Sequence, residues 1–223
     1  MDRSKQHIIA CATVMEEMRP LIPEGLTHTV FDFGLHITPK KLHNTLQEAI
    51  DRADAQYETI FLGYGLCSLA IAGISARHCT LVIPRVDDCI AIFLGSRDAY
   101  LTQFNQQPGT YYLTKGWMEI GDTPFREYDR TLETHGKERA DLVYEMMMAQ
   151  YTRLVFIHTN ASDTDSSRNY ARTTAARFGL AYEEIQGSDR LIRKMLFGPW
   201  DEEFVVVQPG ESVTMEQFIL MDA

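Results

Sequence analysis

Short apolar runs alternate with longer amphipathic segments along this chain, and that alternation is typical of an α/β fold. The segments between successive runs are long enough for the helical crossovers that parallel strands require. We therefore expect a mostly parallel, doubly wound, Rossmann-like sheet. The runs predicted to be strands are residues 7–14, 27–36, 58–65, 79–85, 110–117, 153–160, 180–186 and 203–211.

A polar, irregular stretch at residues 119–135 interrupts this pattern. It indicates two packed α/β lobes, residues 1–118 and residues 119–223, although one continuous domain fits the pattern as well. The residues 89–104 carry the apolar spacing of a single helix. Further helices are predicted to begin after Thr38, near Lys137, near Ser166 and near Asp189.

The overall charge argues against two classes of partner. The 223 residues carry a formal net charge of −10, whereas nucleic acids and anionic membrane surfaces attract basic proteins. No apolar run approaches the ~20 residues that a membrane-spanning helix needs. The N-terminal segment lacks the pattern of a signal peptide, so we expect a cytoplasmic location. The four cysteines are then expected to be free thiols.

Three of these cysteines and one histidine follow predicted strands. Cys11, His36, Cys67 and Cys89 each stand where one of the first four strands ends, whereas Cys79 opens its strand. Parallel sheets bind ligands beyond the carboxyl ends of their strands. The sequence therefore predicts that the four side chains meet at one edge and that Cys79 is structural.

Thiols and an imidazole that meet in this way can bind a metal. Three cysteines and a histidine suit tetrahedral zinc, and three cysteines can hold an iron–sulfur cluster with one iron open. No C-x-x-C pair supports the assignment locally. Two alternatives remain open: one reactive thiol at Cys67 or Cys89, or cysteines that only fill the core.

Charged residues precede Cys89 and are the candidate catalytic groups. Arg85 can anchor a carboxylate, and Asp87 or Asp88 can transfer protons or orient a ligating histidine. The simpler interpretation is an arginine–aspartate pair that closes a loop.

Other residues near predicted strand ends are candidates for binding a small-molecule substrate. These residues are Tyr64, Lys115, Trp117, His158 and Asn160. The last four also have an ordinary structural interpretation in packing, helix capping or surface charge. The glycine patterns of dinucleotide sites and of P-loops are absent, as are the nucleophile elbow and the cobalamin-binding D-x-H-x-x-G pattern.

Several segments in order along the chain carry a family resemblance: "ACATVMEEM", "LHITPKKL", "GYGLCS", "PRVDDCIAIFLGS", "PGTYYLTKGW" and "GPWDEEFVVVQPGE". The sequence resembles a domain-of-unknown-function family of anaerobic bacteria and archaea, which is often encoded beside corrinoid-dependent methyltransferase systems for methylated amines. The resemblance implies a setting in one-carbon metabolism, with a corrinoid protein or a methyltransferase as partner. The family pattern tends to have histidine where this chain has Asp87 or Asp88, which weakens the metal assignment if that histidine is a ligand.

Three functions follow from these observations. The first is an enzyme that uses zinc or an iron–sulfur cluster for methyl transfer, thiol transfer or Lewis-acid chemistry. The second is a non-catalytic module that binds or delivers a metal, a cofactor or a small molecule, and the third is a metal-free domain for protein contacts. The sequence favours the enzyme slightly, because acid–base groups lie near the cysteines, and it is compatible with a homo-oligomer.

Overall fold

The structure is a computed structural model that describes residues 2–67, 69–159 and 165–219. The chain forms two compact units. Unit 1 consists of Met1–Tyr100 and Ser188–Ala223, and unit 2 consists of Leu101–Gly187. The two units are mixed α/β, as the sequence predicts, and each is described below by itself.

Within the described residues, unit 1 is built on a sheet with the strand order β2-β1-β3-β4-β8. The first four strands run parallel, and β8 pairs with β4 in the antiparallel direction. This arrangement confirms the mostly parallel, Rossmann-like sheet. The strands are β1 (Gln6–Cys11), β2 (Thr27–Phe31), β3 (Thr59–Gly63), β4 (Thr80–Pro84) and β8 (Phe204–Val207).

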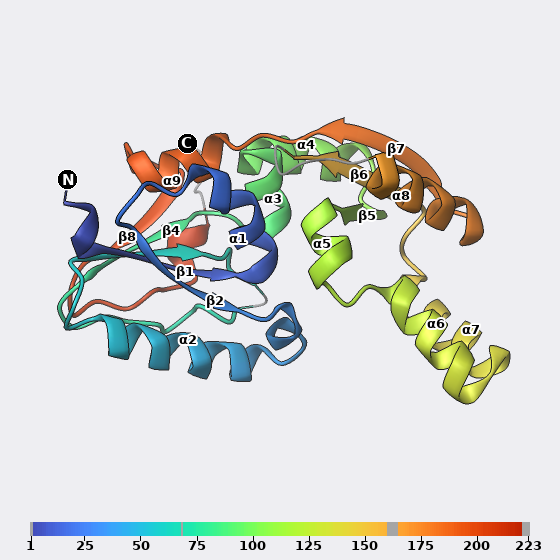
Figure 1. Cartoon of the computed structure of the whole chain (residues 1–223), viewed down its shortest axis with the longest axis horizontal. Coiled ribbons are helices and arrows are strands. Elements are labelled where there is room, and N and C mark those ends of the chain that lie inside the picture. Colours follow the sequence, from blue (N-terminus) through green and yellow to red (C-terminus); the bar gives the residue numbers. More distant parts are fainter. Residues whose placement is uncertain (1, 68, 160–164, 220–223) are drawn as a thin grey trace. The chain divides into compact units, whose positions relative to one another are not determined.

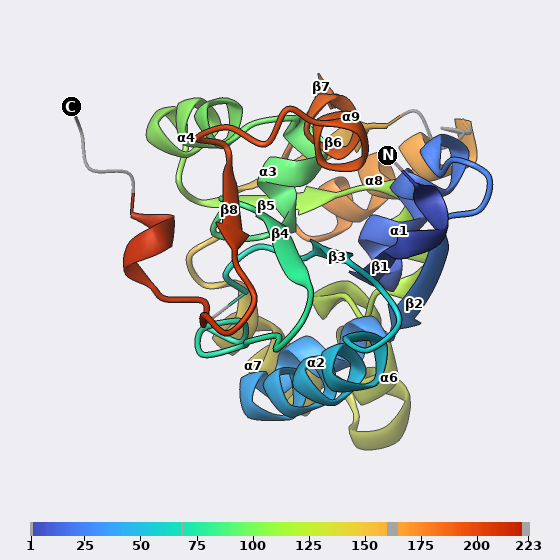
Figure 2. The ribbon, with the colours of Figure 1, turned by 90° about the vertical axis from the view of Figure 1, so that its left-hand side faces the viewer.

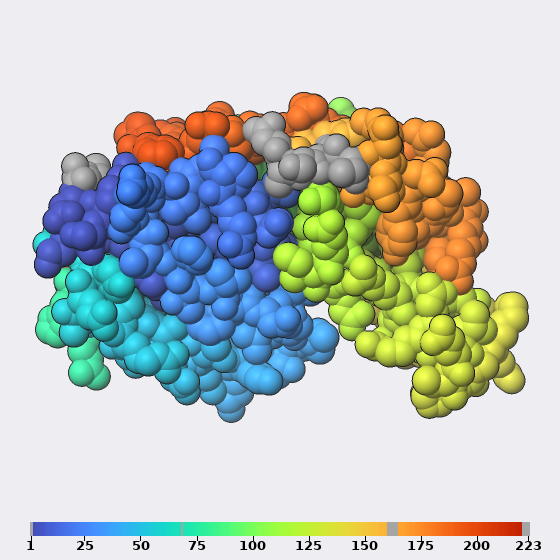
Figure 3. Space-filling model, in the orientation of Figure 1, coloured from blue at the N-terminus to red at the C-terminus, as the bar shows by residue number. Residues whose placement is uncertain are grey.

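Helices cover both faces of this sheet (Figures 1 and 2). The helix α2 (Pro39–Ala53) lies on one face, and α1 (Ala12–Met18), α3 (Cys89–Leu94) and α9 (Arg190–Phe197) lie on the other. Strands buried on both faces read as continuous apolar runs, and Ile60, Phe61 and Leu62 of β3 are fully buried. In the space-filling view, the residues of α9 lie beside those of the N-terminal segment (Figure 3).

Four short 3₁₀ helices complete the described part of unit 1. They are η1 (Arg3–Lys5), η2 (Arg19–Leu21), η3 (Phe33–Ile37) and η4 (Glu216–Phe218). The first two strands are therefore shorter than predicted. β1 gives way to α1 after Cys11, and β2 ends at Phe31 before η3 begins. In each of the ranges 7–14 and 27–36, the apolar residues thus belong to two consecutive elements, a strand and the helix that follows it.

The single helix predicted at residues 89–104 is wrong, because Gly95 breaks it into α3 and α4 (Arg97–Gln106). Gly95 has φ +86°, in the left-handed region that glycine adopts without strain. A Cβ atom at this position would lie 2.6 Å from the Ser188 Cβ. Gly95 thus interrupts the helix at the point where Ser188, the first residue of the second segment of unit 1, packs against it.

Unit 2 is built on a second parallel sheet, with the described strands in the order β5-β6-β7. Its core contains Leu113, Phe125, Leu154, Phe156 and Ala171. The helices α6 and α7 pack on each other, and α8 packs on β6 and β7. The elements are β5 (Thr110–Leu113), α5 (Lys115–Ile120), α6 (Pro124–His135), α7 (Lys137–Met148), β6 (Arg153–His158), α8 (Asp165–Arg177) and β7 (Ala181–Gln186).

The division of the chain differs from the expected lobes 1–118 and 119–223. Unit 2 is an insertion, because residues 188–223 return to unit 1 and place β8 beside β4. The stretch expected to be irregular contains α6, which Pro124 opens at the first helical position and Thr123 caps through its hydroxyl. No described helix is both long enough and apolar enough to cross a membrane.

Candidate metal centre

Three cysteines of unit 1 lie together at the carboxyl edge of its sheet. Cys11 ends β1, Cys67 lies in the loop after β3, and Cys89 opens α3 after β4. Because these three strands are adjacent and parallel, their carboxyl ends meet. Burial is the main cause of the raised pKa values of Cys67 and Cys89, and charge on Cys11 adds to the rise at both, as charge on Cys67 does at Cys89. These three thiols are called the thiol cluster below.

Glycines in the loop after β3 allow this close approach. A Cβ atom on Gly63 would lie 2.6 Å from the Ala10 Cβ, and one on Gly65 would lie 2.8 Å from the Val86 carbonyl oxygen. The loop after β4 then accepts two backbone hydrogen bonds, from Leu66 N to Val86 O at 2.8 Å and from Cys67 N to Asp87 O at 2.9 Å. The two glycines of "GYG" thus bring the cysteine loops together.

Cys67 has an unusual backbone conformation for a residue with a side chain. Its φ angle is +46°, in the left-handed region. Such conformations cost about 1–3 kcal/mol and persist only where the surroundings enforce them. The hydrogen bond from Cys67 N to Asp87 O is one such constraint. The loop therefore holds this thiol in place against a local strain.

Burial keeps the thiol cluster protonated. It raises the pKa of Cys67 to about 12, that of Cys89 well above 9.0, and that of Cys11 above its ordinary value. The Thr13 hydroxyl, 3.3 Å from the Cys11 sulfur, opposes part of this rise. Nearby cationic groups lower thiol pKa values and a coordinated metal deprotonates a thiol outright, so these buried thiols are neutral unless a cation joins them.

The Tyr64 hydroxyl is a buried polar group beside the cluster. Tyr64 is 1% exposed, and its hydroxyl has no hydrogen-bond partner within the described ranges. Burial raises its pKa, and so do Cys11 and Cys67, which places the hydroxyl near both thiols. An unpaired buried hydroxyl costs about 1–3 kcal/mol. A ligand that accepts a hydrogen bond at this point would remove that cost.

His36 lies against Tyr64 from the 3₁₀ helix η3. Its ring stacks on the Tyr64 ring with centroids 5.9 Å apart, and its Nδ1 lies 2.9 Å from the Phe33 carbonyl oxygen. A carbonyl can only accept, so Nδ1 carries the proton. Burial lowers the pKa of His36, which favours the neutral ring. The neutral tautomer leaves a lone pair on Nε2, the form in which histidine binds metals.

Of the two aspartates before Cys89, Asp88 belongs to the cluster. Its Oδ1 accepts a hydrogen bond from Ile90 N at 2.8 Å and caps α3. Burial raises the pKa of Asp88, and its charge raises the pKa values of Cys67 and Cys89. Asp87 is half exposed and lies 3.7 Å from the Arg97 Nε.

Arg85 extends toward β8 instead. Its Nη2 donates to the Phe204 carbonyl oxygen at 3.3 Å. The expected pair of Arg85 with Asp87 or Asp88 is not an ion pair of the structure, because Asp87 pairs with Arg97 and Asp88 caps a helix.

The remaining predicted residues belong to unit 2. Lys115 and Trp117 lie on α5, and not on a strand, because β5 ends at Leu113 and Thr114 caps the following helix. Lys115 pairs with Glu119 of the same helix at 3.6 Å. His158 ends β6, with its Nε2 2.7 Å from Glu184 Oε2. Asn160 lies outside the described residues.

Cys79, which the sequence predicts to be structural, and Trp200 both have structural partners in unit 1. Cys79 is fully buried at the start of its strand, and its backbone N–H donates to Asp54 at 2.9 Å. Trp200 packs edge-on against Phe61 and donates from its indole N–H to the Met195 carbonyl oxygen at 2.9 Å. Thr13, which bonds the Cys11 thiol, carries no motif that would distinguish it in the sequence.

The thiol cluster is not a preformed ligand shell. Among the residues that the structure describes, no three His, Cys, Asp or Glu side chains are grouped closely enough to hold a metal ion. The thiols are near one another and protonated. To bind a metal ion, their side chains would have to change rotamer so that the sulfur atoms point toward a common position.

The chain was compared with known proteins at the level of families, curated proteins and solved structures. Residues 30–196 match the model of a family described as a protein of unknown function (DUF1638). The chain belongs to this family. No curated protein and no solved structure matches it. The DUF1638 match includes His36, Tyr64, Cys67 and Cys89, and it begins after Cys11.

Proposed function

We propose that this DUF1638 protein binds zinc or an iron–sulfur cluster through Cys11, Cys67 and Cys89. The observation that carries the proposal is the meeting of three thiols from three separate segments, two buried and that of Cys89 on a partly buried residue. They lie beside the Tyr64 hydroxyl, which has no hydrogen-bond partner among the described residues. Sulfur ligands from sequence-distant loops suit both zinc and iron–sulfur clusters. The neutral His36, with its free Nε2 lone pair, is the candidate fourth ligand for zinc.

The donor chemistry fits a cation better than it fits an empty core. Burial raises the pKa of all three thiols, and charge on Cys11 raises that of Cys67 further, while charge on Cys67 or Cys11 raises that of Cys89, so the three do not ionise together without a cation. A divalent cation or a cluster reverses this effect, because it stabilises the thiolates that bind it. The strained Cys67 backbone and the orphaned hydroxyl are features that packing alone does not require.

One residue favours an enzyme over a delivery module. Asp88 is a buried carboxyl group whose pKa is raised, and it faces Cys67 and Cys89. A carboxyl group whose pKa is raised in this way is a candidate to donate and accept a proton during a reaction. A module that only stores or delivers a metal has no use for such a group. We therefore favour metal-assisted methyl transfer, thiol transfer or Lewis-acid chemistry on a small molecule.

The setting of that chemistry is a further part of the proposal. The resemblance noted above suggests corrinoid-linked one-carbon metabolism in the cytoplasm, with a corrinoid protein or methyltransferase as partner. The low pI, about 5.1, is compatible with a partner that is not a nucleic acid. Detection of a complex with a corrinoid protein would support this setting.

The direct test is the content of metal and acid-labile sulfide in untagged protein purified without oxygen. We expect about one zinc per chain without visible absorption, or iron with sulfide and a broad band near the blue end of the spectrum. Cys67→Ala should lose the metal or cluster. Cys79→Ala is the matched control, because Cys79 is an equally buried cysteine outside the cluster, and it should retain the metal.

Protein that contains no metal and takes none up would refute the metal proposal. The same conclusion would follow if a folded Cys67→Ala protein bound metal as tightly as the unchanged chain. Circular dichroism of each variant separates loss of the metal from loss of the fold.

A further inference from the structure

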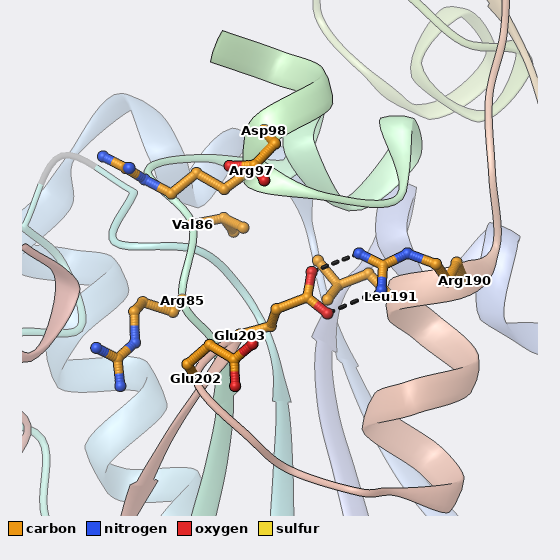
Figure 4. Close-up of a pocket in the computed structure, with 8 residues that line it drawn as sticks. All are labelled: Arg85, Val86, Arg97, Asp98, Arg190, Leu191, Glu202 and Glu203. Carbon is orange, nitrogen blue, oxygen red and sulfur yellow. Dashed lines mark hydrogen bonds and ion pairs between the residues drawn. The ribbon is translucent and has the colours of Figure 1, made fainter. Parts of the chain in front are cut away.

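A second candidate site lies in unit 1, in a cavity at the end of β4 (Figure 4). The first residues after β4, the starts of α4 and α9, and the turn before β8 form its walls. Its volume is about 220 Å³, below the roughly 300–1,000 Å³ of pockets for drug-sized ligands. The cavity therefore suits a small molecule.

Two arginines on its wall have unmet hydrogen-bonding capacity. The Nε atoms of Arg85 and Arg97 are buried and have no hydrogen-bond partner in the part of the chain that the structure describes. Arg85 forms no ion pair there, and the carboxylate next to Arg97 is Asp87, at 3.7 Å. In Figure 4 both side chains extend in the same direction, away from Arg190 and Glu203 on the opposite wall, with Val86 between them. Buried donors of charged groups are costly unless an acceptor meets them.

The third arginine on the wall is already neutralised. Arg190 forms two bonds to the carboxylate of Glu203, drawn as dashed lines in Figure 4. Lys194 also donates to Glu203, at 2.6 Å. The charges of Arg190 and Glu203 therefore already offset each other, and neither side chain is the main attraction for a charged ligand.

Two acids on the wall lie outside the ion pairs of the described residues, although Glu203 and, to a lesser extent, the charge of Asp98 contribute to the raised pKa of Arg190. Asp98 and Glu202 are exposed and form no ion pair within residues 2–67, 69–159 and 165–219. The cavity thus offers two cations with an unfilled hydrogen-bond donor, Arg85 and Arg97. It also offers two carboxylates, Asp98 and Glu202, that form no ion pair among the described residues. A phosphate would be attracted by the arginines but repelled by the acids. A simple amine would be attracted by the acids but repelled by the arginines.

We propose that this cavity binds a small zwitterion of the α-amino-acid type. The ligand carboxylate accepts hydrogen bonds from Arg85 and Arg97, and the ligand ammonium group faces Glu202 and Asp98. Guanidinium groups match carboxylates in geometry and form the stronger, charge-assisted hydrogen bonds. The proposal does not depend on metal binding at the thiol cluster, because the two sets of residues are different.

Calorimetric titration tests the proposal with probes that carry one or both charges. Glycine, L-alanine and L-serine are the zwitterions, propionate and inorganic phosphate are the anions, and ethylamine is the cation. We expect at least one zwitterion to bind, at least about tenfold more tightly than propionate or ethylamine. Arg85→Gln should weaken that binding about 10–100-fold, as expected for the loss of a charge-assisted hydrogen bond.

Glu202→Gln separates a zwitterion site from an anion site. Glu202 is exposed, so this variant is expected to fold. It should weaken zwitterion binding several-fold and strengthen propionate binding, because one repelling carboxylate is removed. Arg19→Gln is the control, because Arg19 forms an exposed pair with Glu16 outside the cavity. Cys67→Ala should bind the zwitterion normally, which makes the outcome independent of the metal proposal.

Three results would overturn this inference. They are no binding of any zwitterionic probe, binding of phosphate or propionate as tight as that of the zwitterions, and zwitterion binding that Arg85→Gln leaves unchanged in a folded protein.

Discussion

Metal binding to the thiol cluster should release about three protons per zinc ion. Each thiol has a pKa above 9.0, so at pH 7 less than roughly 1% of each is ionised. Zinc binds thiolates, and every thiol that binds must give up its proton. His36 adds no proton to this count, because its lowered pKa leaves it neutral at pH 7.

The affinity for zinc should consequently rise steeply with pH. Three released protons correspond to roughly a thousandfold tighter binding per pH unit, as long as the thiols remain protonated in the free protein. The sign follows from the direction of the shifts. A raised thiol pKa favours the protonated, metal-free form, and raising the pH reduces that penalty.

Calorimetry in buffers with different ionisation enthalpies measures the protons released. Cys67→Ser should lower the number to about two and weaken binding, whereas His36→Gln should weaken binding and leave the number near three. Cys79→Ser should change neither quantity, because Cys79 lies outside the cluster. Release of one proton or none, or a number that Cys67→Ser does not alter, would refute the assignment of the three thiols as ligands.

Three further predictions concern the scaffold. Gly65→Ala should destabilise unit 1 by about 1–3 kcal/mol in urea denaturation and impair metal uptake, because its Cβ would lie 2.8 Å from the Val86 carbonyl oxygen. Burial lowers the pKa of His7 from 6.5 to about 4, so its neutral form contributes stability at pH 7 that is lost as the pH falls from about 6.5 to about 4. Because solvent screens part of this effect, the loss should be about 1–2 kcal/mol and be smaller in His7→Gln, measured by urea denaturation across this range. Asp54→Ala should cost about 2–4 kcal/mol of unfolding free energy in the same assay, because the carboxylate accepts from three consecutive backbone N–H groups that end at Cys79.

The sequence predicted the sheet of unit 1 because its strands carry continuous apolar runs. Ile60, Phe61 and Leu62 are buried on both faces, and such a run between turn signals has few other interpretations. The meeting of Cys11, Cys67 and Cys89 followed from that topology, since parallel neighbours share a carboxyl edge. The ends of elements were less predictable, because side chains decide them locally: Thr114 caps a helix where a strand was expected to continue.

Other features had no local signal. The return of residues 188–223 to unit 1 depends on the pairing of β8 with β4, and a pairing between distant segments leaves no mark in either one. The tautomer of His36 depends on the Phe33 carbonyl oxygen in the turn of η3, which was expected to be part of a strand. The cavity of Arg85 and Arg97 likewise forms only when four separate segments meet.

The insertion of unit 2 also has a consequence for how the protein is made. Pro84 of β4 pairs with Phe204 of β8, so β4 lacks this neighbour until β8 has been synthesised. At about 5–20 residues per second, the roughly 120 residues between them take a ribosome about 6–24 s to add. During that interval β4 is an open edge strand, able to pair with other nascent chains. The synthesis of β8 thus closes this edge of β4, and a message truncated after residue 187 would yield a chain prone to aggregation.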